Sequence, residues 1–187
     1  VVVRHPRNRG KAAAMETGAR AVAERDAREP GSAPRALLFV DADLGATAER
    51  TAALVPPVLA QEADMTIAVL PQQATAGGGR GLVVNLARRG TLAAVGWSPR
   101  QPLSGMRCLS RAAFEAARPL ARGWGVETAL TIDLVRAGFR VLEVPCALQH
   151  RVTGRDWRGQ LHRGRQYRDV ALALAVRRRG RRRPAAS

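Results

Sequence analysis

Two acidic residues, Asp41 and Asp43, stand directly after an apolar run, residues 37–40, in the stretch ALLFVDADLGA. Residues i and i+2 of a strand point to the same side, so the two carboxylates can converge on one divalent cation. Mg²⁺ and Mn²⁺ are commonly held by one or two carboxylates, with substrate phosphates completing the coordination shell. The alternative interpretation is that Asp41 caps the next helix and Asp43 is solvated.

A second charged position lies upstream, where Gly10 and Lys11 open a predicted helix in the stretch NRGKAAAM. Helix N-termini bind anions through their free N–H groups and the helix dipole, so a lysine is unfavourable there unless an anion is present. Lys11 is the only lysine among the 31 basic residues. An exposed Lys11 without a role is the alternative. The basic helix start at Lys11 and the acids Asp41 and Asp43 together predict a site for a metal-bound diphosphate.

The elements that must position these residues alternate between strand and helix patterns. Strands are predicted at 1–3, 36–40, 65–70 and 139–146, with an extended stretch at 101–110. The first predicted helix begins at residue 11, and the second covers 46–61 with an interruption at Pro56. Further helical segments follow the loop at 71–81 and end at about residue 94. The last three helices are predicted over 110–120 with Ser110 as cap, over 126–138, and from 150 to about 179. This alternation predicts an α/β sheet with helices on both faces, and ligand sites in such sheets lie beyond the carboxyl ends of strands.

The charge is concentrated at the C-terminal end of the chain. The 187 residues are 46% hydrophobic, which suits one domain with a sizeable core, and the net charge is +16. Residues 151–187 contain twelve Arg against two Asp. We predict a basic amphipathic helical extension over 151–176 and a disordered Arg-rich tail over 177–187. A helix that covers the domain, contact with an anionic membrane surface and contact with nucleic acid are the interpretations open for this segment.

Composition also sets expectations for the compartment. Cys108 and Cys146 are the only cysteines and do not form a disulfide framework or a zinc site, and no apolar run approaches the roughly 20 residues of a membrane helix. No signal peptide is visible. We therefore expect a cytoplasmic protein, with the inner face of the membrane as a peripheral location. The chain opens on VVV without an initiator Met, and we expect a fragment that begins inside a domain.

Four stretches carry a family resemblance: NRGKAAAM, LLFVDADLG, QPLSGMRCLSR and GWGVETALTIDLVRAGFRVLEVPCALQHR. They resemble the family 2 nucleotide-sugar glycosyltransferases with the GT-A fold, and most of all the bacterial branch that includes the glucosyl-3-phosphoglycerate synthases. The resemblance implies a GT-A-type, Rossmann-like mixed sheet flanked by helices over residues 1–150, lacking the first strands of the family and followed by the basic helix. It also implies that the stretch through Asp169 packs back over the site, with His162 or Arg163 near donor or acceptor.

The resemblance implies a donor site for a nucleotide-diphosphate sugar. Asp41 and Asp43 would be the D-x-D pair, with Asp43 the more direct ligand of Mg²⁺ or Mn²⁺ and His150 completing the metal site. Lys11 would lie near the donor diphosphate, and Gly10 and Gly105 would line the donor site. The alternative is that His150, at the end of a strand, has a structural role only.

It also implies an acceptor side. Glu127, after the turn GWG, would be the general base or would orient a sugar, and Trp124 would stack on a sugar ring. Arg80, in the GGGRG loop, would contact an anionic acceptor, with Arg107 a weaker candidate for the same contact. The alternatives are that Glu127 is a first-turn acid favoured by the helix dipole, that Trp124 packs in the core, and that the loop with Arg80 is merely basic.

The predicted function is a metal-dependent transfer of a sugar from a nucleotide-diphosphate sugar to a hydroxyl acceptor, small or lipid-linked, with a phosphorylated acceptor among the candidates. Inversion and retention of configuration are both open, and a homodimer is considered. The paired acids that bind the nucleotide base in this family are missing, so an inactive truncated remnant is one alternative. A basic protein that binds nucleic acid or a membrane surface is another. A haloacid-dehalogenase-like phosphatase would require a lysine downstream of FVDADLG, and none follows.

Overall fold

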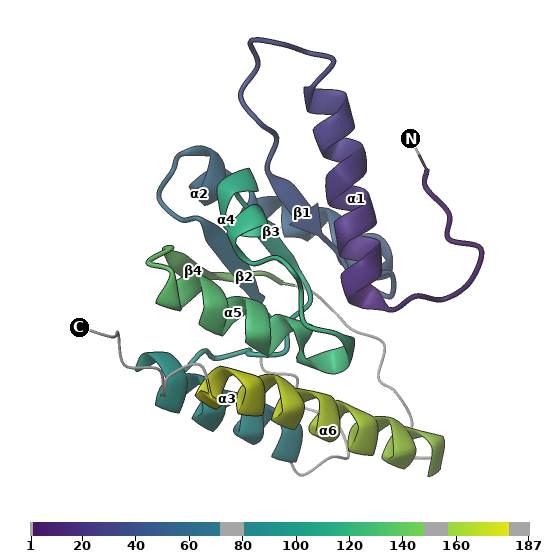
Figure 1. Ribbon diagram of the computed structural model, residues 1–187, viewed down its shortest axis with the longest axis vertical. Coiled ribbons are helices and arrows are strands. Elements are labelled where there is room, and N and C mark those ends of the chain that lie inside the picture. The colour runs from purple at the N-terminus through teal and green to yellow at the C-terminus, as the bar shows by residue number, and fades with distance from the viewer. Residues whose placement is uncertain (1, 72–80, 148–156, 180–187) are drawn as a thin grey trace.

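The computed structural model describes residues 2–71, 81–147 and 157–179, and in the last segment the side chains of residues 164–178 (Figure 1). The predicted residues Arg80 and His150, the side chains of His162 and Arg163, and residues 180–187 lie outside this description. Residues 177–179, which were predicted as the start of a disordered tail, belong instead to the helix Trp157–Arg179, where Arg177 pairs with Asp133.

A four-stranded mixed sheet forms the centre of the molecule. Its strands are β1 (Leu37–Phe39), β2 (Met65–Val69), β3 (Arg107–Leu109) and β4 (Val141–Pro145), in the order β1-β3-β2-β4. β3 runs antiparallel to β1 and β2, and β2 runs parallel to β4. The carboxyl ends of β1, β2 and β4 therefore lie at the same edge as the amino end of β3. The D-x-D stretch and the segment before β3 meet at this edge.

Helices connect the strands and cover the sheet. They are α1 (Lys11–Asp26), the 3-10 helix η1 (Gly45–Leu54), α2 (Pro56–Leu59), α3 (Leu82–Val95), α4 (Arg111–Ala116), the 3-10 turn η2 (Gly123–Gly125), α5 (Val126–Arg136) and α6 (Trp157–Arg179). Ser110 caps α4 as predicted, because its hydroxyl accepts a hydrogen bond from the Ala113 N–H at 3.2 Å. None of the helices in the described segments is long and apolar enough to cross a membrane.

The two faces of the sheet have separate cores. On one face, α1, α4 and α5 pack against residues such as Met65, Ile67 and Leu109. On the other, η1 and α2 pack against Ala68 and Cys108. This alternation of side chains along β2 and β3 is what a strand buried on both faces requires, and it confirms the prediction of an α/β sheet with helices on both faces.

α6 and α3 form a further layer outside α5 (Figure 1). Val170 and Leu174 of α6 are buried with Ala87 of α3 and Ile132 of α5. At its other contact, α6 lies so close to η2 that a Cβ built on Gly125 would come within 2.6 Å of the Asp169 carbonyl oxygen. The basic helix is thus packed on the domain through an apolar face.

Two further local predictions are wrong. Val2 and Val3, predicted as a strand with Val1, are exposed and belong to no strand of the described sheet. β-branched residues favour strands only where a neighbouring strand supplies hydrogen bonds, and no described strand pairs with this segment. The helix predicted over 110–120 ends at Ala116, because the chain turns before the buried side chain of Leu120 joins the core.

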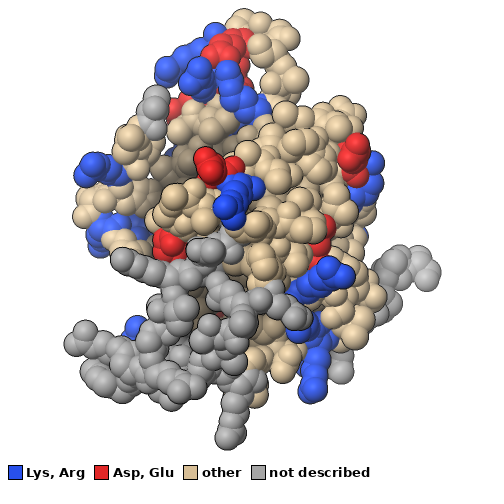
Figure 2. Space-filling view, turned by 180° about the vertical axis from the view of Figure 1, so that it is seen from behind, with Lys and Arg blue, Asp and Glu red and all other residues tan. Residues whose placement is uncertain are grey.

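The described basic side chains do not form one continuous surface on the face shown in Figure 2. The described Lys and Arg side chains there lie in separate groups, with acidic side chains next to several of them. Arg35, for example, binds both Asp26 and Glu29, which lowers the pKa of both carboxyls through hydrogen bonds from its guanidinium. Several basic side chains in the described part of the chain are therefore paired with neighbouring acids.

The contact between Gly125 and α6 gives a test of this packing. We expect Gly125→Ala to lower the free energy of unfolding by about 1–3 kcal/mol, because the new methyl group meets backbone that cannot rotate away. Gly18→Ala is the matched control: a Cβ at this helical position meets nothing within 4 Å, so it should stabilise by roughly 1 kcal/mol. Urea denaturation of both variants measures the difference, and equal stabilities would contradict the close packing of α6 on η2.

Candidate active site

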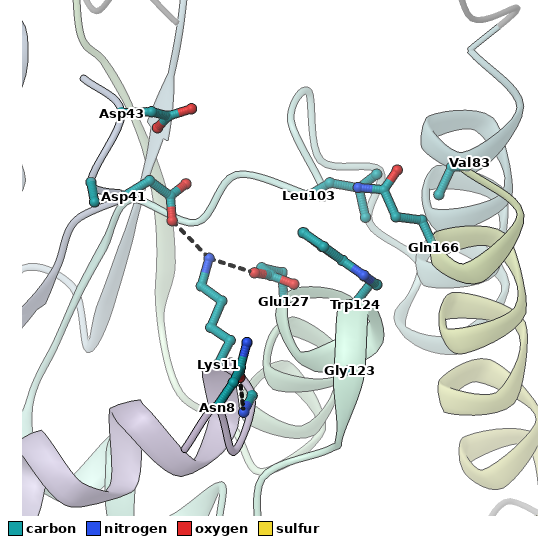
Figure 3. Close-up of a pocket in the computed structure, with 12 residues that line it drawn as sticks. Asn8, Lys11, Asp41, Asp43, Val83, Leu103, Gly123, Trp124, Glu127 and Gln166 are labelled. Carbon is teal, nitrogen blue, oxygen red and sulfur yellow. Dashed lines mark hydrogen bonds and ion pairs between the residues drawn. The ribbon is translucent and has the colours of Figure 1, made fainter. Parts of the chain in front are cut away.

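A cavity of about 640 Å³ lies at the edge of the sheet where β1 ends. One wall carries most of the polar groups, and the other is mainly apolar (Figure 3). Its lining residues are Asn8, Gly10, Lys11, Asp41, Ala42, Asp43, Val83, Leu103, Gly123, Trp124, Glu127 and Gln166. The cavity thus brings together Gly10, Lys11, Asp41, Asp43, Trp124 and Glu127, all of which were predicted as site residues.

Lys11 lies between two carboxylates. Its Nζ is 2.9 Å from Asp41 Oδ1 and 2.8 Å from Glu127 Oε1 (Figure 3). Burial alone would lower the pKa of Lys11, but Glu127 and, more weakly, Asp41 outweigh it, so the pKa is raised above its usual value. Lys11 is therefore a fixed positive charge at neutral pH. The side chain of Glu127 is buried apart from a 7% exposed fraction, which makes this pair less screened than a surface ion pair.

Local backbone features bring the three side chains together. The Gly10 N–H donates to Asn8 Oδ1 at 2.8 Å, and Gly10 itself has φ 82°, so the chain turns tightly into α1 at Lys11. Gly105, ahead of β3, passes so close to the ion pairs that a Cβ would clash with Lys11 Nζ and with the Asp41 carboxylate. Gly105, which was predicted to line the donor site, thus lies against Lys11 and Asp41, and this position requires the absence of a side chain.

Asp43 lies beyond Asp41 and further from Lys11, and its carboxylate is on the same side of the chain (Figure 3). Asp43 is exposed and Asp41 is half-buried. Carboxylate oxygens at the rim of an open cavity are suitable ligands for Mg²⁺ or Mn²⁺. No group of three potential metal ligands occurs among the described residues. The donor set therefore fits a cation that takes further ligands from a substrate or from a residue such as His150.

The apolar wall is built by α3, the segment before β3, η2 and α6. Trp124 is 41% exposed and lines the cavity instead of the core, so the core interpretation of this residue is wrong. The carboxylate of Asp169, in α6, accepts a hydrogen bond from the backbone N–H of Trp124 at 3.2 Å. Gln166, also in α6, lines the cavity opposite Lys11 (Figure 3). α6 thus packs back over the site, as the resemblance implied.

Arg107 does not occupy the position predicted for it. It was a weaker candidate for contact with an anionic acceptor, but it is 1% exposed and does not line the cavity. As a residue of the central strand β3, it points into the core between sheet and α5, where Thr131 binds it. Arg80, the stronger candidate, lies outside the described residues.

Some cavity residues were not predicted from the sequence. Asn8 could have been found, because Asn two residues before a glycine at a helix start is typical of an Asx turn. Val83, Leu103 and Gln166 could not, because they reach the cavity only through the packing of α3 and α6 against the sheet.

Comparisons with known proteins agree with this geometry. Neither a scan of protein-family models nor a search of curated proteins finds a match. Among solved structures, the chain is similar to glucosyl-3-phosphoglycerate synthase from Mycobacterium tuberculosis in complex with phosphoglyceric acid, with 28% identity, a TM-score of 0.64, and coverage of 92% of this chain and 56% of that one. A second structure of this enzyme, with Mn²⁺, uridine diphosphate and phosphoglyceric acid, has 27% identity, a TM-score of 0.64, and coverage of 92% and 55%.

A third structure of this enzyme, with Mn²⁺, UDP-glucose and glycerol 3-phosphate, has 26% identity, a TM-score of 0.61, and coverage of 92% of this chain and 56% of that one. The chain thus spans a little over half the length of the structures it matches. These matches confirm the predicted fold class, a GT-A-type α/β domain, and the predicted resemblance to the glucosyl-3-phosphoglycerate synthases.

Proposed function

We propose that this chain carries the diphosphate and catalytic part of a metal-dependent glycosyltransferase that moves a hexose from a nucleotide-diphosphate sugar to a hydroxyl acceptor. The observation that carries the proposal is the bridging of Asp41 and Glu127 by Lys11 in a cavity that Asp43 also lines. This arrangement supplies a cation for a diphosphate, acids for a metal and an acid beside them for the acceptor. The solved relatives were crystallised with uridine diphosphate or UDP-glucose and Mn²⁺ or Mg²⁺.

Asp43, Asp41 and His150 would hold Mg²⁺ or Mn²⁺. When bound, the ion neutralises the charge that develops on the leaving diphosphate. Lys11 adds a second positive charge on the same side, and its raised pKa keeps it protonated throughout the physiological range. Backbone N–H groups at the start of α1, after Gly10, provide further donors for an anion.

Glu127 is placed to hold the acceptor. Lys11 binds one oxygen, Oε1, and the other oxygen points toward the Trp124 side of the cavity (Figure 3). A carboxylate held in one orientation by an ion pair can accept a hydrogen bond from an acceptor hydroxyl and take its proton as the hydroxyl attacks. If the enzyme retains configuration, the same contact orients the acceptor or the donor sugar.

The acceptor side combines an aromatic surface with polar groups. Trp124 can stack on a sugar ring, and the amide of Gln166 can bind a hydroxyl across the cavity. We further propose a phosphorylated acceptor, bound by Arg80, because the relatives were crystallised with phosphoglyceric acid or glycerol 3-phosphate. A lipid-linked acceptor is the alternative to a small one. We also propose a homodimer and a cytoplasmic location with peripheral contact to anionic membrane.

An inactive remnant is the second candidate function. The observation that favours it is that none of the described residues lining the cavity has an assigned role in binding the nucleotide base. Nucleic-acid binding has less support, because it gives no role to the ion pairs that Lys11 makes with Asp41 and Glu127 at the cavity.

Replacement of Asp43 tests the metal site. We expect Asp43→Asn to weaken Mn²⁺-dependent binding of uridine diphosphate at least about 10-fold, since a removed metal ligand costs affinity for metal and diphosphate together. His150→Ala should have the same effect. Isothermal titration with and without Mn²⁺ measures it, and Asp64→Asn, at the opposite edge of the sheet, is the control. Binding that is unchanged in both variants would contradict the metal site.

Replacement of Glu127 separates binding from chemistry. Glu127→Gln should lower kcat by roughly 10²–10⁴-fold, because an amide cannot accept the acceptor's proton, while the affinity for metal and nucleotide stays within a few fold. Glu115→Gln changes an exposed acid of α4 and should leave both unchanged. Release of the nucleotide diphosphate from a panel of nucleotide sugars provides the assay. A Glu127→Gln variant with full kcat would exclude the role of base.

Lys11 provides a pH-dependent test. Because it is the only lysine, protein labelled with lysine that carries ¹³C at the ε carbon alone gives one side-chain signal, whose titration reports the pKa directly. We expect this pKa to lie above the ordinary 10.5 and to fall in Glu127→Gln, since Glu127 contributes most to raising it and burial opposes it. The ion pair contributes to stability fully below the ordinary pKa and loses that contribution as the pH rises through the raised one. The same pKa in both proteins would show that the pair does not form.

A further inference from the structure

Arg107 is a buried cation that the proposed chemistry does not use. It stands at the start of β3, between β1 and β2, opposite Phe39 on one side and Ile67 on the other. Its side chain is 1% exposed, and no carboxylate forms an ion pair with it among the described residues. Burial of a charge without a direct partner is unfavourable, so the residue's presence here requires another explanation.

The guanidinium binds one segment of the cavity wall. Arg107 Nε donates to the Ser104 carbonyl oxygen at 2.8 Å, and one terminal nitrogen donates to the Pro102 carbonyl oxygen at 3.2 Å. Leu103, between these two acceptors, lines the cavity. Gly105, directly after them, fits closely against Lys11 and Asp41. The fork of Arg107 thus fixes the backbone on which the Lys11–Asp41 contact rests.

The same guanidinium binds the helix that carries Glu127. Its other terminal nitrogen donates to Thr131 Oγ1 at 2.8 Å, and that hydroxyl in turn donates to the Glu127 carbonyl oxygen at 3.0 Å. Arg107 therefore connects the segment before β3 with the first turn of α5. Gly105 in that segment lies against Lys11 and Asp41, and Glu127 in that turn pairs with Lys11.

Charge supports the same role. Burial lowers the pKa of Arg107 to about 10, and Glu127, Glu143 and Asp41 act in the opposite direction. The guanidinium is still protonated at neutral pH. Its positive charge thus offsets part of the repulsion between Asp41 and Glu127, which share Lys11.

We infer that Arg107 is a positioning residue of the proposed transferase: by holding the Pro102–Gly105 backbone and the first turn of α5 at a fixed separation, it sets the distance between Asp41 and Glu127 that Lys11 spans. The role rests on the proposed function for its kinetic consequence, but the geometry can be tested without activity. Arg107 does not touch substrate, so its loss acts through Lys11, Asp41 and Glu127.

The experiment uses the single Lys11 signal of ¹³C-lysine-labelled protein together with kinetics. Arg107→Met removes the hydrogen bonds and the charge, and Thr131→Val removes only the link to α5. Arg111→Met is the matched control, because Arg111 also binds a backbone carbonyl and an acid, Ala19 and Asp26, but at the α1–α4 contact. Thermal unfolding establishes that each variant is folded.

We expect the Lys11 signal to move by more than its linewidth in both Arg107→Met and Thr131→Val and to stay in place in Arg111→Met. In Arg107→Met, kcat should fall roughly 30- to 100-fold, since misplacement by about 1 Å can cost 10²-fold, while KM for the nucleotide sugar stays within about threefold. Arg107→Lys, which keeps the charge and part of the hydrogen bonding, should restore a substantial part of kcat.

Three results would overturn the positioning role. The first is a Lys11 signal that is unchanged in folded Arg107→Met, or in Thr131→Val if the methionine variant does not fold. The second is a loss of kcat no greater than in Arg111→Met. The third is a rise in KM that accounts for the whole loss. A wild-type protein that transfers no sugar would contradict the proposed function alone, and the position of the Lys11 signal would still decide the role of Arg107.

Discussion

The ion pairs of Lys11 with Asp41 and Glu127 are the interaction on which the site depends. They join three elements far apart in the sequence, the start of α1, the end of β1 and the start of α5, at one side chain. Two carboxylates that close to each other would repel, and the ammonium between them removes that repulsion. The close approach requires that position 105 has no side chain and that Gly10 turns the chain into α1 at a positive φ.

The mixed direction of the sheet explains why these groups meet at one edge. Because β3 runs against its neighbours, the segment that enters β3 reaches the same edge as the segments that leave β1, β2 and β4. The D-x-D stretch is therefore opposite the Pro102–Gly105 backbone. α6 then closes the cavity from outside through Asp169, which binds the Trp124 N–H, and through Gln166.

Local patterns predicted most of the fold. The apolar runs that became β1, β2 and β4, the cap at Ser110 and the alternation of helix and strand were readable because each depends on neighbouring residues. Pairing order, and with it the isolation of Val2 and Val3, depends on contacts between distant segments and could not be read in this way. The same applies to Arg107: its type indicated an anion contact, whereas its place on a central strand buries it.

The site was predictable to the extent that its residues carry charge in short motifs. Asp41, Asp43, Lys11 and Glu127 were named from their places at strand or helix ends, but nothing in the sequence indicated that Lys11 would contact both Asp41 and Glu127. The roles of Arg80 and His150 stay predictions, because they lie outside the described residues.

The central claim is that a metal-bound diphosphate sits beside Lys11, and paramagnetic broadening of the Lys11 signal tests it most directly. Mn²⁺ bound together with uridine diphosphate at Asp43 and Asp41 would broaden the single ¹³C-lysine signal beyond detection, whereas diamagnetic Mg²⁺ with the same nucleotide would shift it without loss. A Lys11 signal that remains sharp at saturating Mn²⁺ and uridine diphosphate would contradict the account.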